Sequence, residues 1–282
     1  MAEKIDPKNL PSSDWDWLEK NELWDRNAAA AWLSPLAGID LILLNIEKTK
    51  QLRLSPNKQL GITAEHLKGE NLIHLRGFGK LKKLSAPRNL DDIGLEYIGQ
   101  LGKLTTLYLS GDQFTDAGLK HLSNLAKLKN FETEWLPSGG EAIKILAKLP
   151  NISSMGLNQT ELTDEDLIPL KDSKLKVLNI GGKNITGQSL QYIGQITSLE
   201  ELMLGSYAYT QKITDESLKQ LSGLVNLKRL TLQGTEVTAK GLAYLEPLKS
   251  LKKLRLNRSL CGTPEAKALK AKIPGLAIGD NK

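Results

Sequence analysis

The chain has 282 residues, of which 40% are hydrophobic and 25% charged, a composition typical of a soluble globular protein. Its one cysteine, Cys261, excludes an internal disulfide framework, and three scattered histidines add too few ligands for a zinc site. The net charge of +6 is unevenly divided, because residues 1–48 carry nine acids and five bases whereas residues 49–282 carry 33 bases and 23 acids. This shift in charge marks residues 1–48 as a separate unit.

The first predicted element is a tryptophan-rich helix within residues 13–33. Ser13 and Asp16 stand at the spacing of a capping box, with aspartate in place of the usual glutamate. Apolar residues at helical spacing then form one stripe: Trp17, Trp24, Ala28 and Trp32. Pro35 ends this helix, because proline cannot donate the backbone hydrogen bond that a helix interior requires.

The most apolar run of the chain follows, from Ala28 to Ile46. It contains Asp40, and a charge near the middle of a membrane span is costly, so the run is interpreted as protein core and no membrane partner is expected. Periodicity does not decide whether residues 36–46, LAGIDLILLNI, form a helix or a strand. The first 27 residues are acidic, unlike a secretory signal, so the expected location is the cytoplasm.

From residue 49 onward one phrase, L-x-x-L-x-L, repeats along the chain. Its copies begin at residues 81, 104, 128, 152, 175, 199, 227 and 251, with two weaker ones, TKQLRL at 49 and IPGLAI at 273. From 81 onward the spacing between copies lies between 22 and 28 residues. Each copy predicts a short strand whose leucines point to one side and whose intervening residues point to the other.

A second phrase lies between the strands and predicts a helix, as in FTDAGLKHLSNL. Five threonines precede these helices and are the expected N-caps: Thr115, Thr163, Thr186, Thr214 and Thr238. Asp116, Asp164 and Asp215 follow directly, where a negative charge suits the positive end of the helix dipole. Each unit is therefore a strand, a turn, a capped helix and a return.

These phrases resemble the leucine-rich repeat family, in its longer form with a full helix in each repeat. The TDAGLKHL-type segments are similar to repeats of bacterial proteins and of ribonuclease-inhibitor-like chains. The resemblance implies a curved α/β solenoid, with parallel strands on the concave face and helices on the convex face, of about nine to ten units over residues 49–282. Because such folds serve as frameworks for many functions, the resemblance names no partner.

Some repeats depart from the pattern. The repeat at 128 has Phe131 and Thr133 at apolar positions, and the repeat at 199 is lengthened by GSYAYTQK. The 32 residues between the strands at 49 and 81 predict an insertion within residues 61–79. The helix of residues 13–33 has two interpretations: a cap that covers the apolar end of the first repeat, or an aromatic surface patch that grips a partner.

Sequence patterns of catalysis are absent. No phosphate-binding loop, G-x-S-x-G, H-E-x-x-H or C-x-x-C occurs in the chain. His66 and His121 fall in repeat helices, and Cys261 lies in a closing turn without a neighbouring base. We therefore expect neither enzymatic activity nor a cofactor.

The outward positions of the strands are the remaining place for function. Small residues dominate the middle strands, whereas polar, aromatic and charged residues flank them. The predicted partner-binding residues are Tyr108, Glu132, Glu134, Trp135, Met203, Tyr207, Tyr209, Arg229, Lys253 and Arg255. Aromatic residues and arginine are enriched among interface anchors, and the last three residues form a predicted cationic patch.

The first hypothesis is a non-enzymatic module, monomeric alone, that binds a partner protein on the concave face. The sequence does not distinguish an inhibitor or immunity protein from an effector or an adaptor. The alternative is non-specific binding of nucleic acid by the basic solenoid, whose sequence pI is about 9.1. Lysines that alternate with glutamates, and strands without interleaved aromatics, make nucleic acid the weaker hypothesis.

Truncation of a stripe tryptophan separates the two interpretations of the first helix. If the helix is a cap, Trp24→Ala or Trp32→Ala removes a buried ring, costs about 3–5 kcal/mol of stability and lowers the melting temperature. If the helix is a surface patch, melting stays unchanged and capture of the partner is lost. Thermal denaturation followed by circular dichroism measures the difference.

Overall fold

The computed structural model describes residues 53–54, 60–63, 81–86, 90–133, 135–136, 139–158, 160–205 and 210–280. The described chain divides into two compact units, which are taken separately below. Unit 1 comprises Met1–Tyr108 and Gln113–Leu128, and unit 2 comprises Leu109–Asp112 and Lys129–Lys282. The predicted tryptophan-rich helix, the run at 36–46 and His66 lie outside the described residues.

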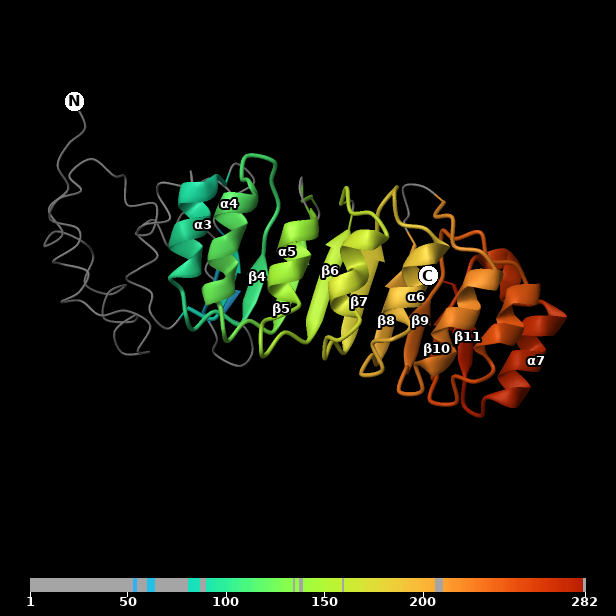
Figure 1. The fold of residues 1–282 in the computed structure, drawn as a ribbon. Helices are drawn as coiled ribbons and strands as arrows, with labels where there is room; N and C mark the ends of the chain where they lie inside the picture. The colour runs from blue at the N-terminus through green and yellow to red at the C-terminus, as the bar shows by residue number, and fades with distance from the viewer. Residues whose placement is uncertain are drawn as a thin grey trace, which may run out of the picture. The chain divides into compact units, whose positions relative to one another are not determined.

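Among the residues that the structure describes, unit 1 contains four strands together with helical segments (Figure 1). Its elements are β1 Arg53–Leu54, β2 Leu60–Thr63, β3 Lys83–Ser85, α3 Asp92–Gly99, β4 Thr106–Tyr108, α4 Asp116–Leu119 and the 3₁₀ segment η3 Lys120–Asn124. Strand β2 pairs in parallel with β3, and β3 with β4, whereas β1 pairs antiparallel with β2. The expected insertion at 61–79 is therefore wrong at its start, because Leu60–Thr63 forms a strand of the sheet.

Unit 2 repeats a strand and a helical segment along its whole length, and the helical segments cover one face of the strands (Figure 1). Its strands are β5 Asn130–Thr133, β6 Ser154–Asn158, β7 Val177–Gly181, β8 Glu201–Leu204, β9 Arg229–Thr231, β10 Lys253–Arg255 and β11 Ala277–Gly279. Its helical segments are α5 Gly139–Leu146, η4 Glu165–Leu170, η5 Gly187–Ser189, α6 Leu190–Ile193, η6 Glu216–Gly223, η7 Lys240–Leu245, η8 Arg258–Leu260 and α7 Pro264–Lys272. Neighbouring strands from β5 to β11 all pair in parallel.

The core of unit 2 is a ladder of aligned apolar residues. One row of register partners crosses all seven strands: Phe131, Met155, Leu178, Leu202, Leu230, Leu254 and Ile278. The first six of these side chains are fully or almost fully buried. Side chains alternate between the two faces of a strand, so burial of this row fixes which residues of each strand point away from the core. The predicted inward direction of the leucines is confirmed.

Hydrogen bonds between successive repeats link the helical side of the fold. The carboxylate of Asp92 accepts hydrogen bonds from the backbone amide and the hydroxyl of Thr115, both at 2.7 Å. The same arrangement joins Asp164 to Thr186 and Asp215 to Thr238. Each carboxylate therefore satisfies a backbone donor at the helix start of the next repeat, a group that would otherwise have no partner within its own helix.

This contact explains why glycine stands three residues after the capping threonine in two repeats. A Cβ atom at Gly118 would lie 2.2 Å from Oδ1 of Asp92, and one at Gly241 would lie 2.2 Å from Oδ1 of Asp215. These separations are far below van der Waals contact, so any side chain there would displace the aspartate. The T-x-x-G spacing is thus required by packing between repeats.

The expected N-caps are confirmed at three of the five threonines. The hydroxyls of Thr115, Thr186 and Thr238 each accept a hydrogen bond from the amide two residues later. At Thr163 the expected direction is wrong, because its hydroxyl donates to Asp166. No side-chain cap is found at the start of η6, where Thr214 was expected to act.

The expectation of a full helix in every repeat is also wrong. Only α3, α5 and α7 reach eight or nine residues among the described α-helices, and the other repeats use a single α-turn or a 3₁₀ segment. A 3₁₀ segment rises more steeply per residue, so it spans the short distance between strands with fewer residues. None of the helices in the described ranges is both long and apolar enough to cross a membrane.

Removal of one bridging carboxylate should weaken the stack of repeats. We expect Asp164→Ala to lower the free energy of unfolding by about 1–3 kcal/mol, because the amide and hydroxyl of Thr186 lose their acceptor in a partly buried place. Urea denaturation measures the change. Asp172→Ala is the control, since Asp172 is exposed in the turn after η4, and an equal loss in both variants would contradict the assigned role.

Candidate functional site

The candidate site is the face of unit 2 that points away from the buried ladder, called here the strand face. Two rows of register partners form it. The first row consists of Asn130, Ser154, Val177, Glu201, Arg229, Lys253 and Ala277. The second row consists of Glu132, Gly156, Asn179, Met203, Thr231, Arg255 and Gly279. Adjacent members of a row belong to adjacent strands and lie about 4.8 Å apart.

The structure brings five of the predicted site residues onto this face: Glu132, Met203, Arg229, Lys253 and Arg255. Trp135 follows β5 and is 46% exposed, and its carbonyl accepts hydrogen bonds from Gly111 and from the Thr133 hydroxyl. Tyr108 is half-buried in β4 and belongs to unit 1. Glu134, Tyr207 and Tyr209 lie outside the described residues, so their assignment stays a prediction.

The second row has an acid near one end and a cation near the other. Glu132 is exposed on β5, Arg255 is half-buried on β10, and the four residues between them are uncharged. Five strand spacings separate the two charges, a distance of about 24 Å. A partner that follows this row meets negative charge first and positive charge last, which favours a single orientation.

Side chains cover more of the uncharged middle of the strand face than the small residues in the sequence indicated. A Cβ atom at Gly156 would lie 3.2 Å from Cγ of Glu132, so the glutamate side chain leans over this glycine. Gly156 is buried as a result, whereas Asn179 and Met203 beside it are half-buried. Together with Thr231, which is also half-buried, these two side chains form the accessible floor of the second row.

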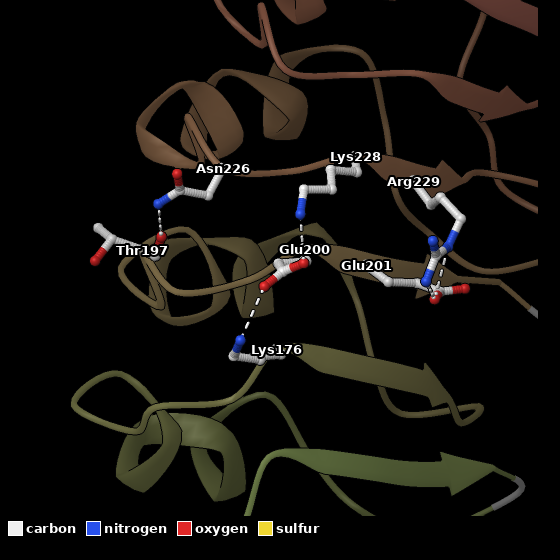
Figure 2. Close-up of polar contacts among 7 residues, drawn as sticks. All are labelled: Lys176, Thr197, Glu200, Glu201, Asn226, Lys228 and Arg229. Atoms are coloured by element: carbon white, nitrogen blue, oxygen red, sulfur yellow. Dashed lines mark hydrogen bonds and ion pairs between the residues drawn. The ribbon is translucent and has the colours of Figure 1, made fainter.

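The first row carries an ion pair that corrects the predicted cationic patch. The guanidinium of Arg229 donates through Nε to Oε2 of Glu201 at 2.8 Å, and its Nη2 contacts the same oxygen (Figure 2). The hydrogen bonds and the charge of Glu201 hold the pKa of Arg229 above its ordinary value. Arg229 is thus compensated within the chain, and the patch is reduced to Lys253 and Arg255.

A second charge ladder lies just before the strands. The carboxylate of Glu200 accepts a hydrogen bond from Nζ of Lys228 at 2.7 Å and faces Nζ of Lys176 at 3.1 Å (Figure 2). The hydrogen bonds from Lys228 and Lys176, together with their charges, lower the pKa of Glu200. Beside this ladder, the side chain of Asn226 donates to the carbonyl of Thr197 (Figure 2).

Sequence reasoning missed Glu200 and Glu201 as site residues, although a signal was present. In LEELML and LKRLTL the two glutamates occupy the same repeat positions as Lys228 and Arg229. Equal positions in neighbouring repeats become neighbours in space, so opposite charges at equal positions predict ion pairs. Lys176 stands at the same position one repeat earlier.

Like charges meet in unit 1, in contrast to this pairing. The nearby ammonium group of Lys103, with a smaller effect of Lys82, lowers the pKa of Lys127. Lys103 and Lys127 hold the same position in successive repeats, LGKL and LAKL. The same register that joins opposite charges in unit 2 therefore produces repulsion here.

Cys261 is half-buried and directly follows η8. Burial and the charge of Asp280 raise the pKa of the Cys261 thiol, which keeps it protonated, and its Sγ lies 3.7 Å from the carbonyl of Asn257. No group of three or more metal-ligating side chains is found among the residues that the structure describes. What the strand face offers is a surface of charges and half-buried side chains.

Comparisons with known proteins bear on the fold. No protein-family model matches the chain. A Trypanosoma equiperdum protein described as a "Putative adenylate cyclase regulatory protein" is 32% identical over 183 residues, which are 63% of this chain. The match spans 27% of that protein's length.

Two solved structures are similar in fold. A chain of the Drosophila Toll–Spatzle complex matches with a TM-score of 0.51 and 14% identity, over 79% of this chain and 30% of that chain. Internalin C2 of Listeria monocytogenes matches with a TM-score of 0.48 and 18% identity, over 71% of this chain and 80% of that chain. With the repeated parallel strands and helical segments, the likeness identifies the fold as an α/β leucine-rich repeat solenoid. By its fold, the chain is a leucine-rich repeat protein.

The Glu200 ladder makes a prediction for the pH dependence of stability. Because the folded state lowers the pKa of Glu200, its contribution is present above the pKa of an unfolded glutamate, about 4.3, and is lost as the pH falls through the lowered value. We expect Glu200→Gln to melt below the unsubstituted protein above about pH 5, and the difference to shrink below about pH 4. Thermal melts across this range test the sign, and a difference that grows at acidic pH would contradict it.

Proposed function

We propose that this leucine-rich repeat protein is a non-enzymatic protein-binding module whose partner docks on the strand face of unit 2. The observation that carries the proposal is the second row, which presents half-buried side chains between an acid on β5 and a cation on β10. Fixed charges of opposite sign at a defined separation supply orientation, and Asn179 and Met203 between them supply contact area.

The charge pattern favours a protein partner over nucleic acid. Glu200 and Glu201 pair with lysine and arginine side chains that would otherwise attract phosphates, and Glu132 adds an exposed negative charge. The two rows that form the strand face also contain no aromatic residue on which bases could stack. A surface of mixed sign suits a protein of complementary pattern better than a polyanion.

Two finer assignments accompany the proposal. The T-x-x-G contacts at Gly118 and Gly241 support assignment of these repeats to the TDAGL type of bacterial and ribonuclease-inhibitor-like chains. The single cysteine, Cys261, leaves the chain without an internal disulfide, which supports a module that works in a reducing compartment such as the cytoplasm.

A charge placed in the middle of the second row tests the proposal. We expect Asn179→Arg to reduce partner capture at least about tenfold, because a long cation would stand where the floor is uncharged. Crosslinked co-purification from lysate, quantified by mass spectrometry, measures which proteins are lost relative to the unsubstituted chain. The matched control is Gln191→Arg, which adds the same charge at an exposed position of α6 on the helical side.

Both variants should keep the circular dichroism spectrum and melting temperature of the unsubstituted protein, since neither position is fully buried. Equal capture by the Asn179→Arg variant and the unsubstituted protein would show that the strand face of unit 2 does not bind the partner.

A further inference from the structure

We propose that Lys253 and Arg255 form an acceptor for a pair of carboxylates on an extended acidic segment of the partner. The inference rests on the proposed function and deepens it, because it states the chemistry of the partner at one end of the strand face. It depends on the register of β10, on the small residues beside it and on the distribution of ion pairs around it.

The spacing of the two cations matches an extended peptide. Lys253 and Arg255 are separated on β10 by Leu254, which is buried in the core, so both side chains point to the strand face. Alternate residues of a strand lie about 6.6 Å apart, and alternate residues of a partner segment aligned with β10 have the same repeat. Two acidic residues with one residue between them can therefore face both cations at once.

Neighbouring strands leave room beside this pair. The register partners on β11 are Ala277 and Gly279, whose side chains are a methyl group and a hydrogen atom. On the other side Lys253 faces Arg229, which is already paired with Glu201, and Arg255 faces the uncharged Thr231. No ion pair joins Lys253 or Arg255 to an acid among the residues that the structure describes.

Two other cations in this part of unit 2 have acidic partners within the chain. Arg258 lies 3.8 Å from Asp280, and Lys272 pairs with Glu246. Lys253 and Arg255 differ from these two cations, because no ion pair with an acid is found for them among the described residues. Arginine binds a carboxylate through two parallel hydrogen bonds and lysine through one strong charge interaction, so the pair combines orientation with attraction.

The surrounding acids limit what the occupant can be. A long polyanion that runs across the strands would meet Glu201 two strands away, about 9.6 Å along the first row, and Glu132 at the end of the second. A short acidic segment aligned with β10 meets only the two cations. The geometry thus favours acidic side chains of a protein over a nucleic-acid backbone.

A synthetic peptide tests the inference without knowledge of the partner. The probe is a fluorescein-labelled peptide in which glutamate alternates with threonine. The control is a second labelled peptide in which glutamine replaces every glutamate. Fluorescence anisotropy is measured with the full chain at low salt and at about 0.15 M ionic strength, where diffuse attraction between exposed charges is screened. We expect the glutamate peptide to bind and the glutamine peptide not to bind.

The variants separate a local acceptor from net charge. Lys253→Gln with Arg255→Gln should weaken binding at least about tenfold, whereas Lys267→Gln with Lys270→Gln, which removes the same charge from exposed positions of α7, should change it less than about twofold. The charge-conserving pair Lys253→Arg and Arg255→Lys should retain most of the binding. Equal weakening in both glutamine pairs, or none in the first, would overturn the inference.

Three further outcomes are decisive. Tighter binding of a single-stranded oligonucleotide through the same two residues would overturn the assignment to acidic side chains. If the peptide depends on Lys253 and Arg255 while Asn179→Arg still captures the partner, the acceptor stands and the proposed function fails. If the Asn179→Arg variant no longer captures the partner, but peptide binding does not depend on Lys253 and Arg255, the proposed function stands and only the acceptor fails.

Discussion

The surface of unit 2 depends on one constraint, the parallel register that the buried apolar ladder imposes. Leu178, Leu202, Leu230 and Leu254 each lie beside the equivalent residue of the next repeat, and each is fully or almost fully buried. A slip of one residue would turn every buried side chain toward solvent, so the hydrophobic cost of a slip fixes the register. Once it is fixed, residues at equal repeat positions become neighbours about 4.8 Å apart.

The charge pattern of the strand face is a direct consequence of this register. Glu201 meets Arg229, and Glu200 meets Lys228 and Lys176, because these residues hold equal positions in successive repeats. The same rule places Lys103 near Lys127 in unit 1, where it lowers the pKa of Lys127. For these residues, the side chain at the same position one repeat away decides whether the charge is neutralised or repelled.

The helical side follows the same logic with hydrogen bonds in place of ion pairs. Asp92 and Asp215 each cap the helical segment of the following repeat, and a glycine of that repeat makes space for the carboxylate. A carboxylate that satisfies backbone donors in the next repeat couples the two repeats more directly than an interaction with its own helix dipole would. The two sides of the fold thus couple nearest neighbours, as expected for a solenoid.

The sequence by itself determined the repeat, the direction of the leucines and the set of residues on the strand face. This was possible because each copy of L-x-x-L-x-L shows, within six residues, which positions are apolar and therefore buried. It also indicated three of five helix caps correctly. Only the tertiary structure decided that Leu60–Thr63 is a strand and that most of the described helical segments are short. It also decided that Arg229 is paired, whereas no acid among the described residues forms an ion pair with Lys253 or Arg255. These features depend on contacts between repeats some 24 residues apart, which the period within one copy does not show. Only a comparison of equal positions in successive repeats indicates the ion pair of Arg229.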